Sequence, residues 1–150
     1  MIFVDTGAFL AKYIAKDEHH RASISPWYAL EKSKERLFTT NFVLDETFTL
    51  LGRRAGYAFA AQKARAILSS SAITILRPGK YDEIEAVKLF EKFADQSVSY
   101  TDCISFVLMH SNKIERVFTF DRHFELAGFA LIPWRGSSLA YDLFRMMILC

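Results

Sequence analysis

After Met1 the chain opens with Ile2-Phe3-Val4-Asp5-Thr6-Gly7, where a short apolar run ends at a carboxylate. The β-branched and aromatic residues before Asp5 have the composition of a buried strand. A carboxylate is costly to bury without a partner, so Asp5 needs a reason to follow such a strand directly. The opening stretch therefore predicts either a helix N-cap or a functional group at the edge of a sheet.

Segments of strand and helix character alternate along the rest of the chain. Such alternation predicts an α/β domain with a mainly parallel sheet, whose ligands bind outside the carboxyl ends of the strands. Asn41 is expected to cap the third helix, and Gly52 or Gly56 to end it. The helix at 81–93 carries an apolar stripe of Ile84, Val87, Leu89, Phe90 and Phe93. Strands are predicted at residues 2–4, 37–40, 73–76, 116–119 and 129–132, and helices at 8–15, 20–34, 41–51, 57–69, 81–93 and 99–109, with a helical turn after residue 121.

Composition limits the class of protein. A chain of 150 residues, 51% of them hydrophobic, is sufficient for one domain with one core. The two cysteines form no zinc or disulfide pattern, which fits a reducing cytoplasm. No secretion signal and no membrane span are expected. The net charge of +2 predicts no strong global attraction to nucleic acid, so any such binding has to be local.

Glu46 is the acidic residue with the least ordinary explanation. On a helix its neighbours three and four residues away include Val43 and Leu50, so its carboxylate projects from the apolar face. Asp45 has a more polar flank. A Glu is almost never buried without a partner, which leaves a buried salt bridge or a ligand site. Glu46, rather than Asp45, is predicted to point inward.

Asp102 and Asp121 each have a structural explanation and a functional one. Ser99-Tyr100-Thr101-Asp102 fits a capping box, yet the helix that follows is apolar on nearly every side, so its first turn could face a site. Asp121 could cap a short helix, and Thr119 could support it by hydrogen bonding. Asp121 also lies just beyond a predicted strand, at the edge where ligands bind.

Taken together, the four acids predict a metal site. Carboxylates that a fold brings together repel one another unless a cation lies between them, and oxygen ligands suit Mg²⁺ or Mn²⁺. The leading hypothesis is metal-assisted hydrolysis of a phosphodiester. The basic pair Arg53 and Arg54 could bind the phosphate backbone of the substrate, or could only solvate a helix.

In four segments the chain resembles the PIN domain family, and more narrowly the small VapC-type toxin ribonucleases. The segments occur in the family's order and span roughly residues 1–134. The resemblance implies a three-layer α/β/α domain with a mainly parallel central sheet of four to five strands. The four segments are Ile2-Phe3-Val4-Asp5-Thr6-Gly7-Ala8-Phe9, Thr39-Thr40-Asn41-Phe42-Val43-Leu44-Asp45-Glu46, Ser99-Tyr100-Thr101-Asp102 and Phe118-Thr119-Phe120-Asp121-Arg122-His123-Phe124.

The same resemblance implies the activity and the partners. Asp5, Glu46, Asp102 and Asp121 would be the catalytic and metal-binding acids of a Mg²⁺- or Mn²⁺-dependent endoribonuclease. Thr6 and Thr119 would be supporting hydroxyls. Hydrolysis by an activated water would leave a 5′-phosphate and a 3′-hydroxyl. A small antitoxin covering the acidic site and a homodimer are also expected. The apolar surplus, including Trp27 and Tyr28, fits either a protein interface or the core.

Other functions remain open at this point. The domain could be a catalytically silent PIN-like module that binds RNA or protein, or a housekeeping RNA-processing nuclease. A receiver-like phosphoacceptor is disfavoured because Asp5 lacks an adjacent acid. His19 and His20, beside Asp17 and Glu18, could suggest a transition-metal site, but a solvated helix end is favoured because no further His lies at ligand spacing. Residues 135–150 form a C-terminal extension of undetermined structure, with apolar positions that would suit an amphipathic helix for self-association.

Overall fold

Five parallel strands form one sheet in the computed structural model, which describes residues 1–133. The strand order is β3-β2-β1-β4-β5, and every neighbouring pair is parallel. The prediction of a mainly parallel sheet of four to five strands is confirmed. No helix within residues 1–133 combines the length and the apolar character that crossing a bilayer would take. The strands are β1 Ile2–Val4, β2 Leu37–Thr40, β3 Ile73–Leu76, β4 Arg116–Phe118 and β5 Ala130–Ile132.

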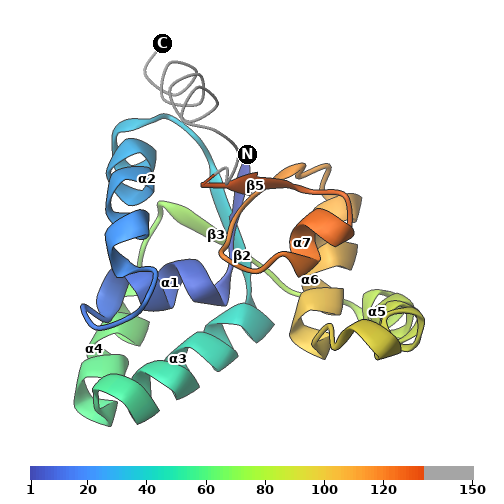
Figure 1. The fold of residues 1–150 in the computed structure, drawn as a ribbon, viewed down its shortest axis with the longest axis horizontal. Helices are drawn as coiled ribbons and strands as arrows, with labels where there is room; N and C mark the ends of the chain where they lie inside the picture. Colours follow the sequence, from blue (N-terminus) through green and yellow to red (C-terminus); the bar gives the residue numbers. More distant parts are fainter. Residues whose placement is uncertain (134–150) are drawn as a thin grey trace.

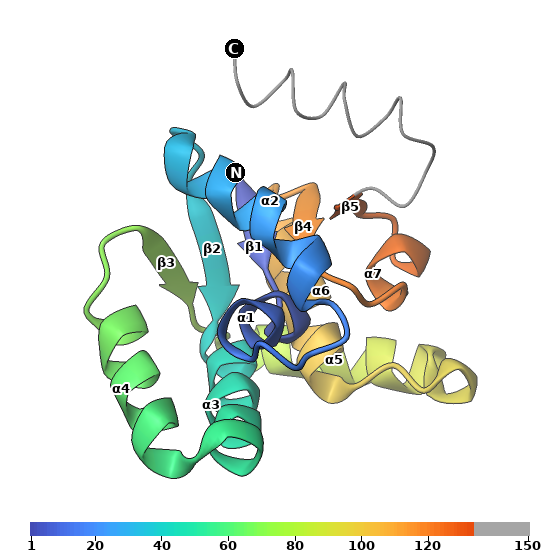
Figure 2. The same ribbon diagram turned by 60° about the vertical axis from the view of Figure 1, so that its left-hand side comes forward.

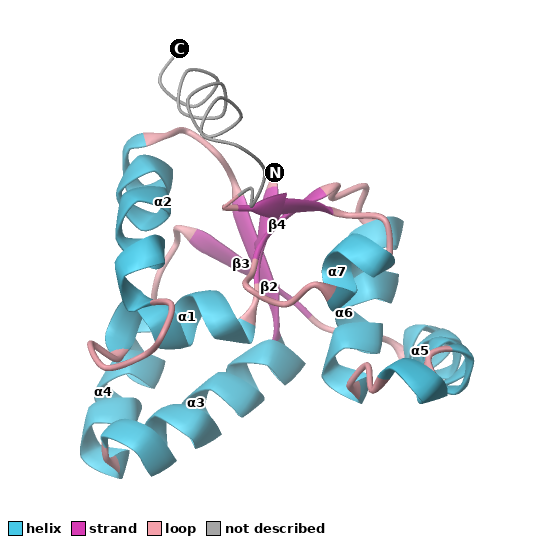
Figure 3. Ribbon diagram, viewed as in Figure 1, coloured by secondary structure: helices cyan, strands magenta, loops and turns pink. Residues whose placement is uncertain are grey.

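Helices cover both faces of this sheet. Figure 1 and Figure 3 show α1 and α2 on one side of the strands and α6 and α7 on the other, which is the predicted three-layer arrangement. The pair α3 and α4 packs side by side and continues beyond the end of β2 (Figure 2). The helices are α1 Thr6–Tyr13, α2 His20–Lys32, α3 Asn41–Ala55, α4 Tyr57–Leu68, α5 Lys80–Lys92, α6 Tyr100–Ser111 and α7 His123–Leu126, with a 3₁₀ turn at Ala94–Gln96.

The sheet order places β1, from the start of the chain, beside β4, from near the end of the described chain. β1 lies between β2 and β4, and Val4 is the register partner of Phe118. The backbone N–H of Asp5 donates to the carbonyl oxygen of Phe118 at 3.1 Å. Residues that follow β1 and β4 therefore leave the sheet side by side. The strand order reverses here, because β2 and β3 follow on one side of β1 whereas β4 and β5 lie on the other. Ligands of open α/β sheets bind at such a point.

Aromatic side chains fill the core on both faces of the sheet. Trp27 of α2 packs on Phe118, with ring centroids 5.1 Å apart, and its indole N–H donates to the carbonyl oxygen of Ala8. On the other face, Phe106 of α6 packs edge-on against Phe124 of α7 at 5.0 Å. Burying rings of this size supplies much of the driving force for folding. The two helical layers are thereby held against the central strands β1 and β4.

The structure corrects the predicted N-cap of α3 and selects Gly56, one of the two predicted glycines, as its end. Thr40, and not Asn41, is the N-cap, because the Thr40 hydroxyl accepts a hydrogen bond from the backbone N–H of Val43 at 3.0 Å. The helix then continues past Gly52 to Ala55 and ends at Gly56, whose φ of 97° suits glycine. Gly52 lies inside the helix, where the lack of a side chain makes room for the start of α4. A Cβ at this position would lie 2.6 Å from the Tyr57 ring.

Some apolar side chains lie elsewhere than the sequence suggested. On α5, Ile84, Val87 and Phe90 are each almost half exposed, and Ala86 is the buried residue of the helix. Trp27 belongs to the core, so it cannot form part of a protein interface, whereas Tyr28 is exposed. The expectations for residues 135–150 lie outside the described part of the chain.

We expect Thr40→Val to lower the free energy of unfolding by about 1–2 kcal/mol, because it removes the cap of α3 at a fully buried position. Thr49→Val is the matched control, since Thr49 lies on the exposed side of the same helix. It should change stability by less than about 0.5 kcal/mol. Urea unfolding followed by circular dichroism measures both. Equal effects of the two substitutions would contradict the assignment of Thr40 as the cap.

Candidate active site

Four acidic side chains from separate parts of the sequence line one cavity of about 380 Å³ at the carboxyl edge of the sheet. They are Asp5, Glu46, Asp102 and Asp121, the residues selected from the sequence. Asp5 follows β1, Glu46 lies in α3, Asp102 lies in the first turn of α6, and Asp121 lies between β4 and α7. The fold thus brings together carboxylates that are up to 116 positions apart in a 150-residue chain.

Asp5 is buried without acting as a helix cap. It occupies the N-cap position of α1, but its carboxylate makes no capping hydrogen bond, so the structural explanation considered for it is wrong. The side chain is instead held by Thr119, whose hydroxyl donates to Asp5 Oδ2 at 2.8 Å. Only 5% of the Asp5 surface is exposed. Its carboxylate is therefore committed to the cavity.

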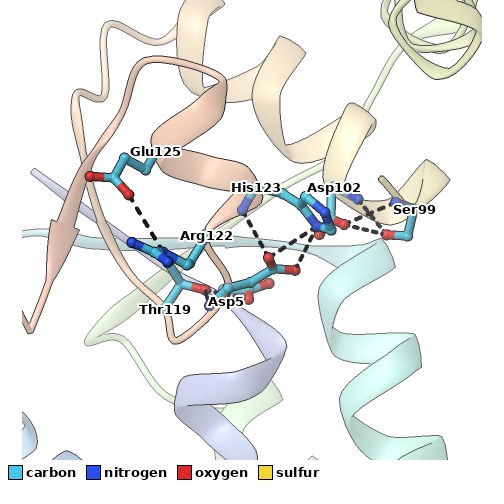
Figure 4. Close-up of polar contacts among 8 residues, drawn as sticks. Asp5, Ser99, Asp102, Thr119, Arg122, His123 and Glu125 are labelled. Atoms are coloured by element: carbon cyan, nitrogen blue, oxygen red, sulfur yellow. Dashed lines mark hydrogen bonds and ion pairs between the residues drawn. The ribbon is translucent and has the colours of Figure 1, made fainter. Parts of the chain in front are cut away.

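Thr119 connects Asp5 to Asp121. The Thr119 hydroxyl also accepts a hydrogen bond from the backbone N–H of Asp121 at 3.0 Å. Asp121 Oδ1 accepts from the backbone N–H of His123 at 2.9 Å, and the imidazole Nδ1 of His123 lies 3.0 Å from Oδ1 and 3.2 Å from Oδ2. Figure 4 shows Asp5, Asp102 and His123 gathered around this segment. One buried hydroxyl thus sets the positions of two of the acids.

Asp102 forms its capping box and still faces the cavity. Its Oδ2 accepts from the backbone N–H of Ser99 at 3.1 Å and from the Ser99 hydroxyl at 2.7 Å, while the Ser99 hydroxyl accepts from the Asp102 backbone N–H at 3.0 Å. Both hydrogen bonds that the Asp102 carboxylate accepts within residues 1–133 use Oδ2, which leaves Oδ1 for another ligand. The capping and functional explanations of Asp102 are therefore compatible.

Glu46 reaches the cavity from the second turn of α3. Its Oε2 accepts a hydrogen bond from the Thr6 hydroxyl at 2.6 Å, so Thr6 at the start of α1 fixes its direction. Asp45, the preceding residue, is exposed. The helical spacing that distinguished the two acids in the sequence is reproduced in the fold, because adjacent positions on a helix point about 100° apart.

Burial, and to a lesser extent repulsion between the carboxylates, disfavours the charged forms of the cavity acids. Burial, together with the nearby charge of Asp102, raises the pKa of Asp5 from its ordinary value of 3.8 to about 7, although the Thr119 hydrogen bond partly opposes this rise. Burial also raises the pKa of Asp102, with a contribution from the charge of Asp121. Carboxylates in such a state are stabilised by a nearby cation. The site has the electrostatic character of a cation site.

The ligand atoms are also close enough for one ion. Asp102, Asp121 and His123 each offer an atom within 4.8 Å of the others, and they form the only such group of three or more found within residues 1–133. Asp5 and Glu46 line the same cavity outside this tight group. Carboxylate oxygens and an imidazole nitrogen are donors that hold divalent cations in proteins. The residues present therefore fit a metal.

Several residues do not lie where the sequence suggested. Arg53 and Arg54 are exposed at the end of α3 and do not line the cavity, and Arg54 pairs with Asp17 at 3.4 Å. The two adjacent histidines do not converge on a metal either. His20 Nδ1 contacts the carbonyl oxygen of Ala11 at 2.7 Å, whereas His19 stacks on Phe120 in the cavity wall.

Cavity residues that the sequence did not assign to the site include His19, Phe120 and His123. His123 could have been found from its place two residues after Asp121. His19 carries no local signal, because its position depends on the path of the loop between α1 and α2.

Comparison with known proteins agrees with this geometry. The sequence matches the PIN domain over residues 2–130. The 23S rRNA-specific endonuclease VapC20 of Mycobacterium tuberculosis is 33% identical over 129 residues, which cover 86% of this chain and 95% of the relative. A VapC ribonuclease of Archaeoglobus fulgidus is 32% identical over 136 residues, covering 89% of this chain and 85% of the relative.

Solved structures share the fold. The crystal structure of VapC20, described as a Sarcin-Ricin loop cleaving toxin, superposes with a TM-score of 0.79 at 31% identity, covering 87% of this chain and 97% of that one. DNA-bound VapBC from Salmonella typhimurium superposes with a TM-score of 0.58 at 14% identity, covering 87% and 95%, which shows the fold alone. The chain belongs to the PIN domain family, and VapC ribonucleases are among its relatives.

Proposed function

We propose that this chain is a Mg²⁺- or Mn²⁺-dependent endoribonuclease that acts in the cytoplasm as the toxin of a toxin–antitoxin pair. The observation that carries the proposal is the convergence of four carboxylates on one cavity, where burial and mutual repulsion raise the pKa of Asp5 and Asp102. The cost of burying these carboxylates together is offset when a divalent cation binds between them, and carboxylate oxygens are ligands for such cations. The names of the relatives, an rRNA endonuclease and a ribonuclease, support RNA as the substrate.

The proposed roles follow from the contacts of each side chain. Asp5, Asp102 and Asp121 would hold the cation, with His123 placed to add a nitrogen ligand or to orient Asp121. Glu46, fixed by Thr6, would orient the attacking water and accept its proton. Thr119 would keep Asp5 and Asp121 in register. The cation, when bound, would lower the pKa of water and stabilise charge on the phosphoryl oxygens, so hydrolysis would leave a 5′-phosphate and a 3′-hydroxyl.

Contacts to RNA beyond the cavity follow from the distribution of arginines. Arg122 directly follows Asp121 and its side chain is 77% exposed, so it is well placed for a phosphate next to the cleaved bond. Arg53 and Arg54 could contact only more distant phosphates, because they lie at the far end of α3 from its cap.

A small antitoxin and a second copy of the chain are the proposed protein partners. A partner that covers the acidic cavity would present a cation to it, since an arginine would relieve the same repulsion as a metal. The exposed apolar side chains of α5, including Ile84, Val87 and Phe90, would suit a contact between copies. A small open reading frame directly upstream of the gene would support the toxin assignment. Its absence would leave a housekeeping nuclease with the same chemistry.

Glu46→Gln, Asp5→Asn and Asp121→Asn should each reduce Mn²⁺-supported RNA cleavage by more than about 100-fold. This loss exceeds the 10- to 100-fold typical of residues that only support a ligand. Asp45→Asn is the matched control, because Asp45 precedes Glu46 on the same helix and is exposed. It should retain wild-type cleavage. The measurement is cleavage-site mapping on total RNA with purified protein, with and without EDTA. Cleavage that survives EDTA, or full activity of Asp5→Asn, would rule out the metal mechanism.

The stability of the metal-free protein should depend on pH through Asp5. Folded Asp5 keeps its proton up to pH about 7, whereas the unfolded residue loses it near 3.8. The stability from this group is therefore complete below pH about 4 and is lost as pH rises through about 7. Asp5→Asn removes this loss, so its gain in unfolding free energy over wild type should be about 2 kcal/mol larger at pH 8 than at pH 5. Asp45→Asn should show no such difference.

Thermal unfolding in the presence of cations completes this test. Millimolar Mn²⁺ or Mg²⁺ should raise the unfolding temperature of the wild type at pH 8, because a ligand that binds only the folded state stabilises it. The same ions should have much less effect on Asp5→Asn. An unchanged wild-type unfolding temperature with both ions would count against the cation site, independently of any RNA assay.

A further inference from the structure

The wall of the acidic cavity contains a stacked pair of rings, His19 and Phe120, that the proposed chemistry does not use. Their centroids are 4.4 Å apart and their planes are 6° from parallel. The other ring pairs within residues 1–133 are inclined by 33° or more, as is usual for side chains packed in a core. The His19–Phe120 pair therefore differs in geometry from the rest of the aromatic packing.

Phe120, the more buried ring of the pair, has a fixed position relative to the acids. Phe120 lies between Thr119 and Asp121, the two residues that connect β4 to the cavity. Phe120 is only 9% exposed, and its ring packs edge-on against Phe118 of the core at 5.9 Å. Phe120 is thus anchored to the central strand, directly beside a proposed metal ligand.

His19, the more exposed ring of the pair, is held by its loop and reaches the surface. The backbone N–H of His19 donates to Asp17 Oδ1 at 2.9 Å, and Asp17 Oδ2 pairs with Arg54 at 3.4 Å, so the loop is tied to α3. About one third of the His19 side chain (33%) is exposed. Phe120 covers one face of the imidazole and Glu18 Oε1 lies 3.5 Å from its Nε2, which leaves the opposite face as the place where a base could stack. The pair presents a pre-positioned aromatic surface toward solvent at the cavity wall.

We propose that the His19–Phe120 pair is a platform on which a base of single-stranded RNA stacks next to the cleaved phosphate. The inference rests on the proposed ribonuclease function and adds to it a subsite for a nucleobase. Aromatic side chains, histidine included, bind unstacked RNA bases by their faces. Such stacking tolerates any base, because each has a π face. In a cavity of carboxylates, which repel phosphates, stacking between the ring and the base supplies attraction that the acids cannot.

The test is steady-state cleavage of an RNA oligonucleotide that spans the main site mapped on total RNA with the wild-type chain. His19→Leu keeps the bulk of the side chain and removes its π face, so it should raise KM about 10-fold and change kcat little. His19→Phe retains a ring and should restore KM to near the wild-type value. Tyr28→Leu is the matched control, since Tyr28 is an exposed ring of α2 that does not line the cavity. It should leave both constants unchanged.

An abasic nucleotide then locates the stacked base. The abasic nucleotide is placed in one oligonucleotide directly 5′ and in another directly 3′ of the cleaved phosphate. One of the two should raise KM for the wild type about as much as His19→Leu does, and should have little further effect on that variant. An unchanged KM for His19→Leu, a loss of kcat alone, or failure of His19→Phe to rescue would each overturn the platform while the nuclease stands. No cleavage of total RNA by the wild type would overturn the proposed function and this inference together.

Discussion

The parallel pairing of β1 with β4 is the constraint on which the site depends. The pair joins strands that are more than 100 positions apart in sequence and sets Val4 opposite Phe118. Because of this register, Asp5 and Thr119 leave the sheet together and a single hydroxyl can hold Asp5 while accepting from the Asp121 backbone. A shift of one residue in this pairing would turn every side chain of one strand to the opposite face of the sheet. Thr119 would then point away from Asp5. The geometry of the acids therefore follows from strand pairing in the core.

Stability and function oppose each other at this edge of the sheet. Burying Asp5 beside Asp102 costs free energy, which is reflected in the raised pKa of both carboxyls. The aromatic core beneath, with Trp27 and Phe118 on one face and Phe106 and Phe124 on the other, supplies the compensating burial. Strain of this kind, concentrated where a ligand would relieve it, is typical of functional sites.

The limits of prediction from sequence are clearest at particular residues. Helical spacing separated Glu46 from Asp45 because both lie within one regular element. The cap of α3 was misplaced by one residue because Thr40 and Asn41 are both good cap formers, and only the path of β2 into the helix favours Thr40. The basic pair at residues 53 and 54 looked suited to phosphate binding, yet its distance from the acids depends on the length and direction of α3. The stripe on α5 was visible, but its exposure depends on what packs against it.

The sequence by itself determined the alternation of strands and helices, the parallel sheet and the four acids, because these depend on local periodicity and on motifs of a few residues. Only the tertiary structure decided which hydroxyls hold Asp5 and Glu46, and that His19 from one loop stacks on Phe120 from another. These relations join residues far apart in the chain. They are set by strand order, register and loop path, and these arise when the whole core packs.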